Sequence, residues 1–92
     1  MKEADPETQR RIVNRLKRAR GQLDSVISAV ESGDGCRDVV TQLSAVSTAL
    51  DRAGFVVVSS AMQFCITDPE AAAASEDGLT VEELEKLFLS LS

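Results

Sequence analysis

The feature that most constrains the fold is the apolar pattern between Cys36 and Cys65, the only two cysteines in the chain. Apolar residues recur there at steps of three or four positions: Val39, Leu43, Val46, Leu50, Ala53, Val57, Ala61 and Phe64. Such steps keep side chains on one face of an α-helix, so they predict one long amphipathic helix.

The two cysteines share the apolar face of this helix but lie at its opposite ends. They are 29 positions apart, which is about eight full helical turns plus about 20° of rotation around the helix axis. The two side chains therefore point in nearly the same direction. A rise of about 1.5 Å per residue separates them by about 43 Å, so they cannot meet within one straight helix. An antiparallel copy, with its two-fold axis near Leu50 and Asp51, would place Cys36 of one chain opposite Cys65 of the other. A two-thiol site therefore requires a dimer.

A first helix is predicted before the cysteine helix. Asp5, Pro6 and Glu7 have the pattern of an N-cap, a proline at the first helical position and an acid in the first turn. The apolar residues that follow keep steps of three and four: Ile12, Leu16, Ala19, Leu23, Val26 and Val30. Gly21 costs about 1 kcal/mol relative to alanine inside a helix, which predicts close packing against another backbone there.

A turn and a linker separate the helices. Residues 32–35 form the turn, with Asp34 as the expected cap of the second helix, and Pro69 ends that helix. Residues 68–79 are acidic and alanine-rich, with room for one helical turn. Residues 80–83 form a capping box that opens a third helix, whose expected buried face is Val81, Leu84, Leu87, Phe88 and Leu91. We expect helices at about 6–32, 35–67 and 80–91 in one all-α domain over residues 1–92, assembled as a bundle.

Bulk composition narrows the functional class. A chain of 92 residues has room for only a modest core, so oligomerisation is an expected source of stability. No run of 18 apolar residues is present and the charged start lacks a signal-peptide segment, so we predict no membrane contact. Two cysteines without a dense framework fit the reducing cytoplasm. The chain has no His and no Tyr, the usual catalytic bases are missing, and we do not expect an enzyme.

Basic residues are concentrated at the start of the chain. Residues 1–20 hold seven of the ten Lys and Arg against three acids, whereas the rest holds three basic and twelve acidic residues. A stripe beside the apolar face consists of Arg11, Arg15 and Arg18, flanked by Arg10, Lys17 and Arg20. This asymmetry favours a nucleic-acid partner for the basic first segment, although the net charge of the whole chain is −5. A simple solvated helix face is the alternative.

The cysteines permit two kinds of chemistry. Cys36 lies in the first turn of its helix beside Arg37, where the helix N-terminus and the cation stabilise a thiolate, so it is the expected attacking thiol. Cys65 lies near the other end and is the expected resolving thiol. Two thiolates also suit Cu(I), with Met62 as an optional thioether ligand. The remaining alternative is that both cysteines are small buried hydrophobes.

Residues 14–54 resemble the CsoR/RcnR family of small bacterial repressors. The matching motifs are RLKR-x-x-GQ, a cysteine shortly after the first helix, and TQ-x-x-A-x-x-x-AL, represented here by Arg15, Leu16, Lys17, Arg18, Gly21, Gln22, Cys36, Thr41, Gln42, Ala45, Ala49 and Leu50. The resemblance extends over about residues 10–91. It implies a three-helix protomer, an antiparallel four-helix-bundle dimer around the second helix and a dimer of dimers. It also implies release of operator DNA when a site between subunits is occupied.

The resemblance also implies roles for single residues. Arg15 and Arg52 match the arginines that contact DNA in the family. Position 8, often basic in the family, is Thr8 here, so a neighbouring arginine is the expected substitute. The expected DNA-binding set is Arg10, Arg11, Arg15, Arg18 and Arg52. Glu83 matches an acidic residue that supports the site of the copper-sensing members.

The same resemblance identifies Cys36 and Cys65 as the sensing thiols. Copper sensors carry His four residues before the second cysteine, where this chain has Ala61. A cysteine pair without that His is similar to the CsoR-like sulfurtransferase repressors, which sense persulfides through sulfur links across the dimer interface. We therefore expect a repressor induced by reactive sulfur species and holding no cofactor. Cu(I) sensing by the same cysteines is the alternative, and more remote ones are a non-sensing helical interaction module and a sulfur-transfer enzyme.

Overall fold

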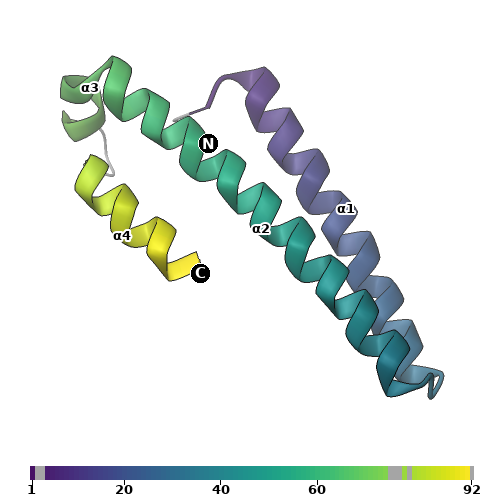
Figure 1. The fold of residues 1–92 in the computed structure, drawn as a ribbon. Helices are drawn as coiled ribbons and strands as arrows, with labels where there is room; N and C mark the ends of the chain where they lie inside the picture. Colours follow the sequence, from purple (N-terminus) through teal and green to yellow (C-terminus); the bar gives the residue numbers. More distant parts are fainter. Residues whose placement is uncertain (2–3, 75–77, 79, 92) are drawn as a thin grey trace.

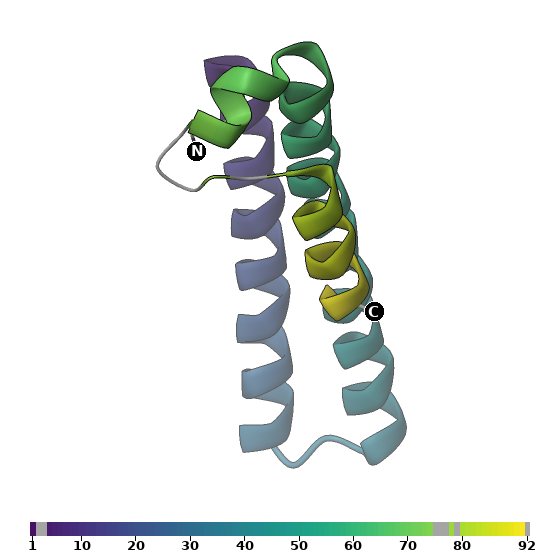
Figure 2. The ribbon, with the colours of Figure 1, turned by 90° about the vertical axis from the view of Figure 1, so that its left-hand side faces the viewer.

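The protein is a helical hairpin with two shorter helices folded against one end. The structure is a computed structural model that describes residue 1, residues 4–74, residue 78 and residues 80–91. Its elements are α1 (Pro6–Glu31), α2 (Cys36–Thr67), α3 (Pro69–Ala74) and α4 (Val81–Leu91). The described ranges contain no strand, so the all-α prediction is confirmed. α1 and α2 run antiparallel side by side, and α4 returns along the second half of α2 (Figures 1 and 2).

Local hydrogen bonds explain where α1 begins and ends. The Asp5 side chain accepts a hydrogen bond of 2.7 Å from the Thr8 N–H, and this bond holds the pKa of Asp5 below its ordinary value. At the other end, Gly33 has a φ of 74°. Its N–H donates to the Val30 carbonyl at 3.1 Å, while the Asp34 N–H donates to the Ala29 carbonyl at 3.0 Å. This is a Schellman motif. Glycine is favoured at its left-handed position because this conformation strains residues that have a Cβ.

One predicted cap is wrong. The N-cap of α2 is Gly35, which makes no side-chain cap hydrogen bond, and not Asp34. Asp34 lies one residue too early for this role, and its N–H already completes the end of α1. The helix boundaries otherwise lie within one residue of the prediction, since α2 starts at Cys36 and α4 at Val81.

The acidic linker contributes a fourth helix. Asp68 accepts a hydrogen bond from the Ala71 N–H at 3.2 Å and so starts α3 directly after α2. The predicted capping box is present in its first half, because Thr80 Oγ1 accepts from the Glu83 N–H at 3.2 Å. The protomer therefore contains α3 in addition to the three helices expected, and α3 lies across the end of the hairpin (Figure 2).

The core is narrow, and much of the predicted apolar face is uncovered. α1 buries Ile12, Ala19 and Val26 at seven-residue steps, and α2 buries Val46 and Ala53 in the same way. Other residues of the predicted apolar faces are 43–60% exposed: Leu16, Leu23, Val30, Leu43 and Leu50. The apolar residues of each helix thus cover two adjacent faces, and only one of these faces packs inside the hairpin. Of the predicted buried face of α4, only Leu84 is buried.

Gly54 and Gly21 differ in how closely other parts of the protomer pack against them. A Cβ on Gly54 would lie 3.2 Å from a methyl group of Leu91, so this glycine allows α4 to approach α2 closely. The close packing predicted at Gly21 does not occur within the described protomer, because nothing lies within 4 Å of a Cβ built there. Gly21 lies on the exposed side of α1.

By length and composition alone, α2 qualifies as a helix that could cross a membrane, and 22% of its most apolar window is buried. An amphipathic helix that packs in an oligomer passes the same test. The exposed apolar side chains of α2 therefore form a surface that we expect another molecule to cover.

Candidate functional site

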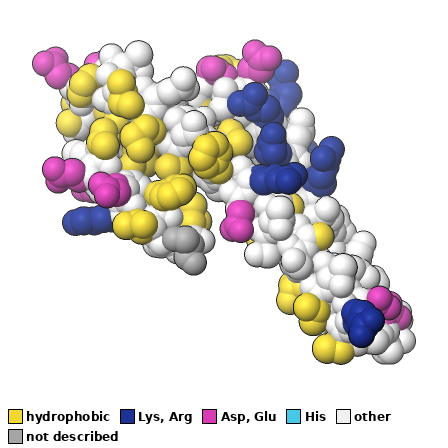
Figure 3. All heavy atoms as spheres, in the orientation of Figure 1, with side chains coloured by type: hydrophobic (Ala, Val, Ile, Leu, Met, Phe, Trp, Pro, Cys, Tyr) yellow, Lys and Arg dark blue, Asp and Glu magenta, His cyan; other side chains and the backbone are white. Residues whose placement is uncertain are grey.

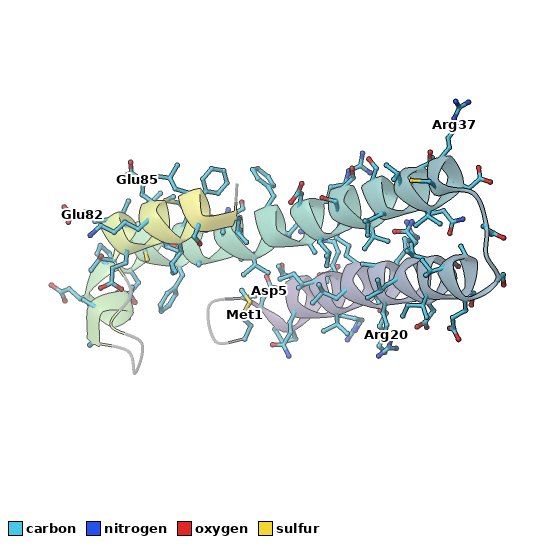
Figure 4. The ribbon with its side chains drawn as sticks, turned by 90° about the horizontal axis from the view of Figure 1, so that it is seen from below. Met1, Asp5, Arg20, Arg37, Glu82 and Glu85 are labelled. Atoms are coloured by element: carbon cyan, nitrogen blue, oxygen red, sulfur yellow. The ribbon has the colours of Figure 1, made fainter. Side chains whose placement is uncertain are left out.

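The two cysteines occupy opposite ends of α2. Cys36 is the first residue of the helix and is exposed, whereas Cys65 lies in its last turn and is only 4% exposed. α2 is continuous over 32 residues, so the thiols of one protomer are held about 43 Å apart. The predicted single long helix is thus confirmed, and the facing of Cys36 and Cys65 across a dimer stays a prediction. Arg37 points outward from the start of α2, away from the hairpin (Figure 4).

Cys65 is enclosed by α3 and α4. It clusters with Ala61 on α2, Ala72 on α3 and Leu84 on α4, which are 5%, 1% and 3% exposed. Met62 packs against the outside of this cluster. The small alanines let three helices meet at the thiol. A reagent or metal ion therefore reaches Cys65 only where these helices leave an opening.

Glu83, the predicted supporting carboxylate, lies at the same end of the molecule. It is an exposed residue of the first turn of α4, next to the Leu84 that covers Cys65. Its position on α4 is set by the bond between its backbone N–H and Thr80. Its neighbours Glu82 and Glu85 point outward from α4 (Figure 4).

No complete metal site forms within the part of the protomer that the structure describes. No group of three or more His, Cys, Asp or Glu side chains is arranged there to hold an ion. Ala61, one turn before Cys65, contributes a buried methyl group to the cluster and no ligand atom. A two-coordinate Cu(I) ion fits two thiolates, so the donor set would consist of one cysteine from each of two protomers.

The predicted DNA-binding arginines gather on one face of the hairpin. Arg15, Arg18 and Arg52 line a cavity of about 330 Å³ between α1 and α2. An adjoining cavity of about 490 Å³ adds Arg11. Four of the five predicted arginines, from two helices, are thus brought together, while Arg10 is exposed on α1 outside both linings. Figure 3 shows the corresponding basic surface over the first half of α1.

The basic face and the exposed apolar face lie on opposite sides of α2. Leu50 and Arg52 are two positions apart, which is about 200° around a helix. Leu43 is seven positions, about two turns, before Leu50 and therefore shares its side of the helix. A partner that covers the leucines therefore leaves the arginines open.

Sequence reasoning missed one polar residue of the basic cavity. Gln22 lines it, and its Oε1 is buried without a hydrogen-bond partner among the described residues. The available signal was its place in the GQ step of the resemblance motif, one turn after Arg18. Thr48 lines the same cavity, and its hydroxyl donates to the Ser44 carbonyl at 3.1 Å.

Residues 8–90 match a family model described as a metal-sensitive transcriptional repressor. The copper-sensing transcriptional repressor CsoR of Mycobacterium ulcerans is 45% identical over 58 residues, which cover 63% of this chain and 50% of the relative. The CsoR of Mycobacterium tuberculosis is 38% identical over 72 residues, covering 74% of this chain and 60% of the relative. The CsoR of Bacillus subtilis is 33% identical over 78 residues, covering 84% and 74%.

The chain therefore spans about half the length of the Mycobacterium ulcerans relative that it matches. No solved structure matches the chain. Because the family match extends over nearly all of the sequence, the chain belongs to the family of metal-sensitive transcriptional repressors, the CsoR/RcnR family.

Proposed function

We propose that this protein represses transcription in the cytoplasm by binding operator DNA as a dimer of dimers. DNA is released when reactive sulfur species link Cys36 of one protomer to Cys65 of its partner. The observation that carries the proposal is the placement of the two thiols at opposite ends of α2, on the side of the helix away from Arg52. The sensing thiols and the DNA-binding face therefore lie on separate surfaces of the same hairpin.

The DNA-binding half of the proposal rests on the basic face. Arg11, Arg15, Arg18 and Arg52 converge from α1 and α2, although the whole chain carries a net charge of −5. Guanidiniums bind phosphate oxygens through paired N–H groups. Binding should therefore weaken steeply as salt rises, because each phosphate contact releases condensed counterions.

The dimer part of the proposal rests on the exposed apolar residues of α2. Leu43 and Leu50 are 50% and 49% exposed in one protomer, which is unusual for a helix of such apolar character. A second α2 packed antiparallel near Leu50 would bury these leucines. It would also place each exposed Cys36 beside the Cys65 cluster of the other protomer.

The sulfur chemistry balances with a persulfide as the only co-reactant. The Cys36 thiolate attacks the outer sulfur of an organic persulfide, which forms a Cys36 persulfide and expels the organic thiolate. The partner's Cys65 thiolate then attacks the Cys36 sulfur and displaces hydrosulfide. The product is a disulfide between protomers: two thiols are oxidised and one sulfane sulfur is reduced to sulfide.

Cu(I) is the second candidate inducer. The relatives from Mycobacterium and Bacillus are named as copper-sensing repressors, and two thiolates suit Cu(I). Ala61 favours sulfur over copper in this chain, because it supplies no third ligand beside Cys65.

One anaerobic experiment separates the two inducers. The reduced protein is bound to a fragment of the region upstream of its own gene, and glutathione persulfide or Cu(I) is added at equal concentration. We expect persulfide to release the DNA and to yield protomers joined through Cys36 and Cys65 on mass spectrometry. Release by Cu(I) alone, with retention of Cu(I) against a strong chelator, would assign the copper function. Failure of the reduced protein to prefer this fragment over random DNA at low salt would overturn the proposed repressor role at that operator.

A further inference from the structure

Gln22 carries a buried polar atom that nothing in the protomer satisfies. Its Oε1 has no hydrogen-bond partner among the described residues, although the residue as a whole is only partly buried. A buried acceptor without a donor has lost its hydrogen bonds to water and gained none in return, so native structures rarely retain one without a role. Such an atom is a candidate acceptor for a donor that arrives in another state of the protein.

The same cavity contains suitable donors. Gln22 lines the space of about 330 Å³ between α1 and α2 together with Arg15, Arg18 and Arg52. An arginine side chain offers five N–H groups in a planar fork, so it can bond an amide oxygen along one edge and a phosphate along another. The unsatisfied acceptor and its candidate donors thus line one half-open cavity.

Helix geometry favours Arg52 as the donor. Side chains lean toward the N-terminus of their own helix. Because α1 and α2 are antiparallel (Figure 2), Gln22 leans along α1 toward the level of Arg52, while Arg52 leans back toward the level of Gln22. Arg15 and Arg18 precede Gln22 on α1 and lean away from it; Arg18, one turn before Gln22 on the same face, is the alternative donor.

We propose that Gln22 is a positioning residue for DNA binding: its Oε1 accepts an N–H from Arg52 and holds that guanidinium with its outer edge toward a DNA backbone phosphate. This inference rests on the proposed repressor function and adds an uncharged residue to its DNA-binding face. Arg15 and Arg18 neutralise the phosphate from the α1 side. Since Gln22 carries no charge, its loss disorders Arg52 without removing an ion pair.

The test is a double-mutant cycle on operator affinity, measured over a range of salt concentrations with the same upstream fragment. Gln22→Leu should weaken binding by roughly 10- to 100-fold, as expected for the loss of a hydrogen bond to a charged group, while the slope of log K against log salt stays unchanged. Arg52→Ala should weaken binding and reduce that slope by about 1 for each Arg52 that contacts a phosphate. In the Arg52→Ala background, Gln22→Leu should have no further effect.

Two controls keep the outcomes distinct. Gln63→Leu makes the same change on the exposed surface of α2, beside Phe55 and Val58 and away from the arginines, and should leave affinity unchanged. Gln22→Met serves as a second isosteric variant, and the melting temperature and oligomeric state of each variant are measured. Unchanged affinity in Gln22→Leu, or additive effects with Arg52→Ala, would overturn the positioning role. Absence of operator binding by the wild type would instead overturn the repressor proposal on which it rests.

Discussion

The two ends of α2 hold their cysteines by different physical means. At the start of the helix, Cys36 is exposed and follows a turn in which Gly33 has a φ of 74°. At the other end, Cys65 is enclosed by Ala72 and Leu84 from α3 and α4. Backbone geometry positions the first thiol, and side-chain packing positions the second.

This difference suits the proposed reaction between the two thiols across a dimer. The exposed Cys36 is accessible to a small reagent before its partner is involved. In the proposed dimer, enclosure would protect Cys65 from unrelated oxidants until a sulfur species is held opposite it. The asymmetry is also open to experiment, because substitutions at the two ends should have effects of different size and kind.

The largest effect is expected at the enclosed end. Leu84→Ala removes a side chain that is 3% exposed and leaves a cavity over Cys65, which should cost about 2–5 kcal/mol of unfolding free energy. Alkylation of Cys65 by iodoacetamide should become faster at the same time. Urea unfolding at fixed protein concentration measures the first effect and mass spectrometry the second. Leu87→Ala, at a position 53% exposed, is the matched control, and an equal loss there would mean that α4 packs mainly through its other face.

The next effect separates the cysteines themselves. Cys65→Ser replaces a buried thiol with a smaller, more polar hydroxyl group and should cost about 1–3 kcal/mol, whereas Cys36→Ser, at an exposed position, should stay within about 0.5 kcal/mol. Both variants should bind operator DNA and lose the response to persulfide. Thermal unfolding and gel shifts with and without inducer measure the two properties. Equal destabilisation would show that a partner protomer buries Cys36 as deeply as α3 and α4 bury Cys65.

Much of the fold followed from local patterns in the sequence. The steps of three and four residues predicted α1 and α2, and the Asp5 cap and the Thr80 capping box predicted two helix starts. α3 was harder to predict, because an alanine-rich segment after Pro69 has strong helix propensity but no amphipathic pattern. The exposure of Leu43 and Leu50 could not be read from spacing, since the period alone does not say which of two apolar faces packs inside the hairpin.

The candidate site was predictable to a similar degree. Charge clustering on α1 indicated the basic face, but only the hairpin packing shows that Arg52 from α2 completes the same cavity as Arg15. The enclosure of Cys65 depends on Ala72 and Leu84, which follow it by 7 and 19 positions and carry no chemical signal of their own. The GQ step singled out Gln22 but not its role, because a missing hydrogen bond is visible only in three dimensions.

The smallest effect tests whether backbone geometry holds the Cys36 end. Gly33→Ala forces an L-residue into the left-handed region at φ 74° and should cost about 1 kcal/mol. Gly21→Ala is the control, because Gly21 lies inside α1 without a positive φ and an added Cβ would meet nothing within 4 Å at either position. It should stabilise α1 by up to about 1 kcal/mol. If the two substitutions have equal effects on urea unfolding, the turn does not position Cys36. The exposed thiol would then depend on a partner protomer for its placement, as Cys65 depends on α3 and α4.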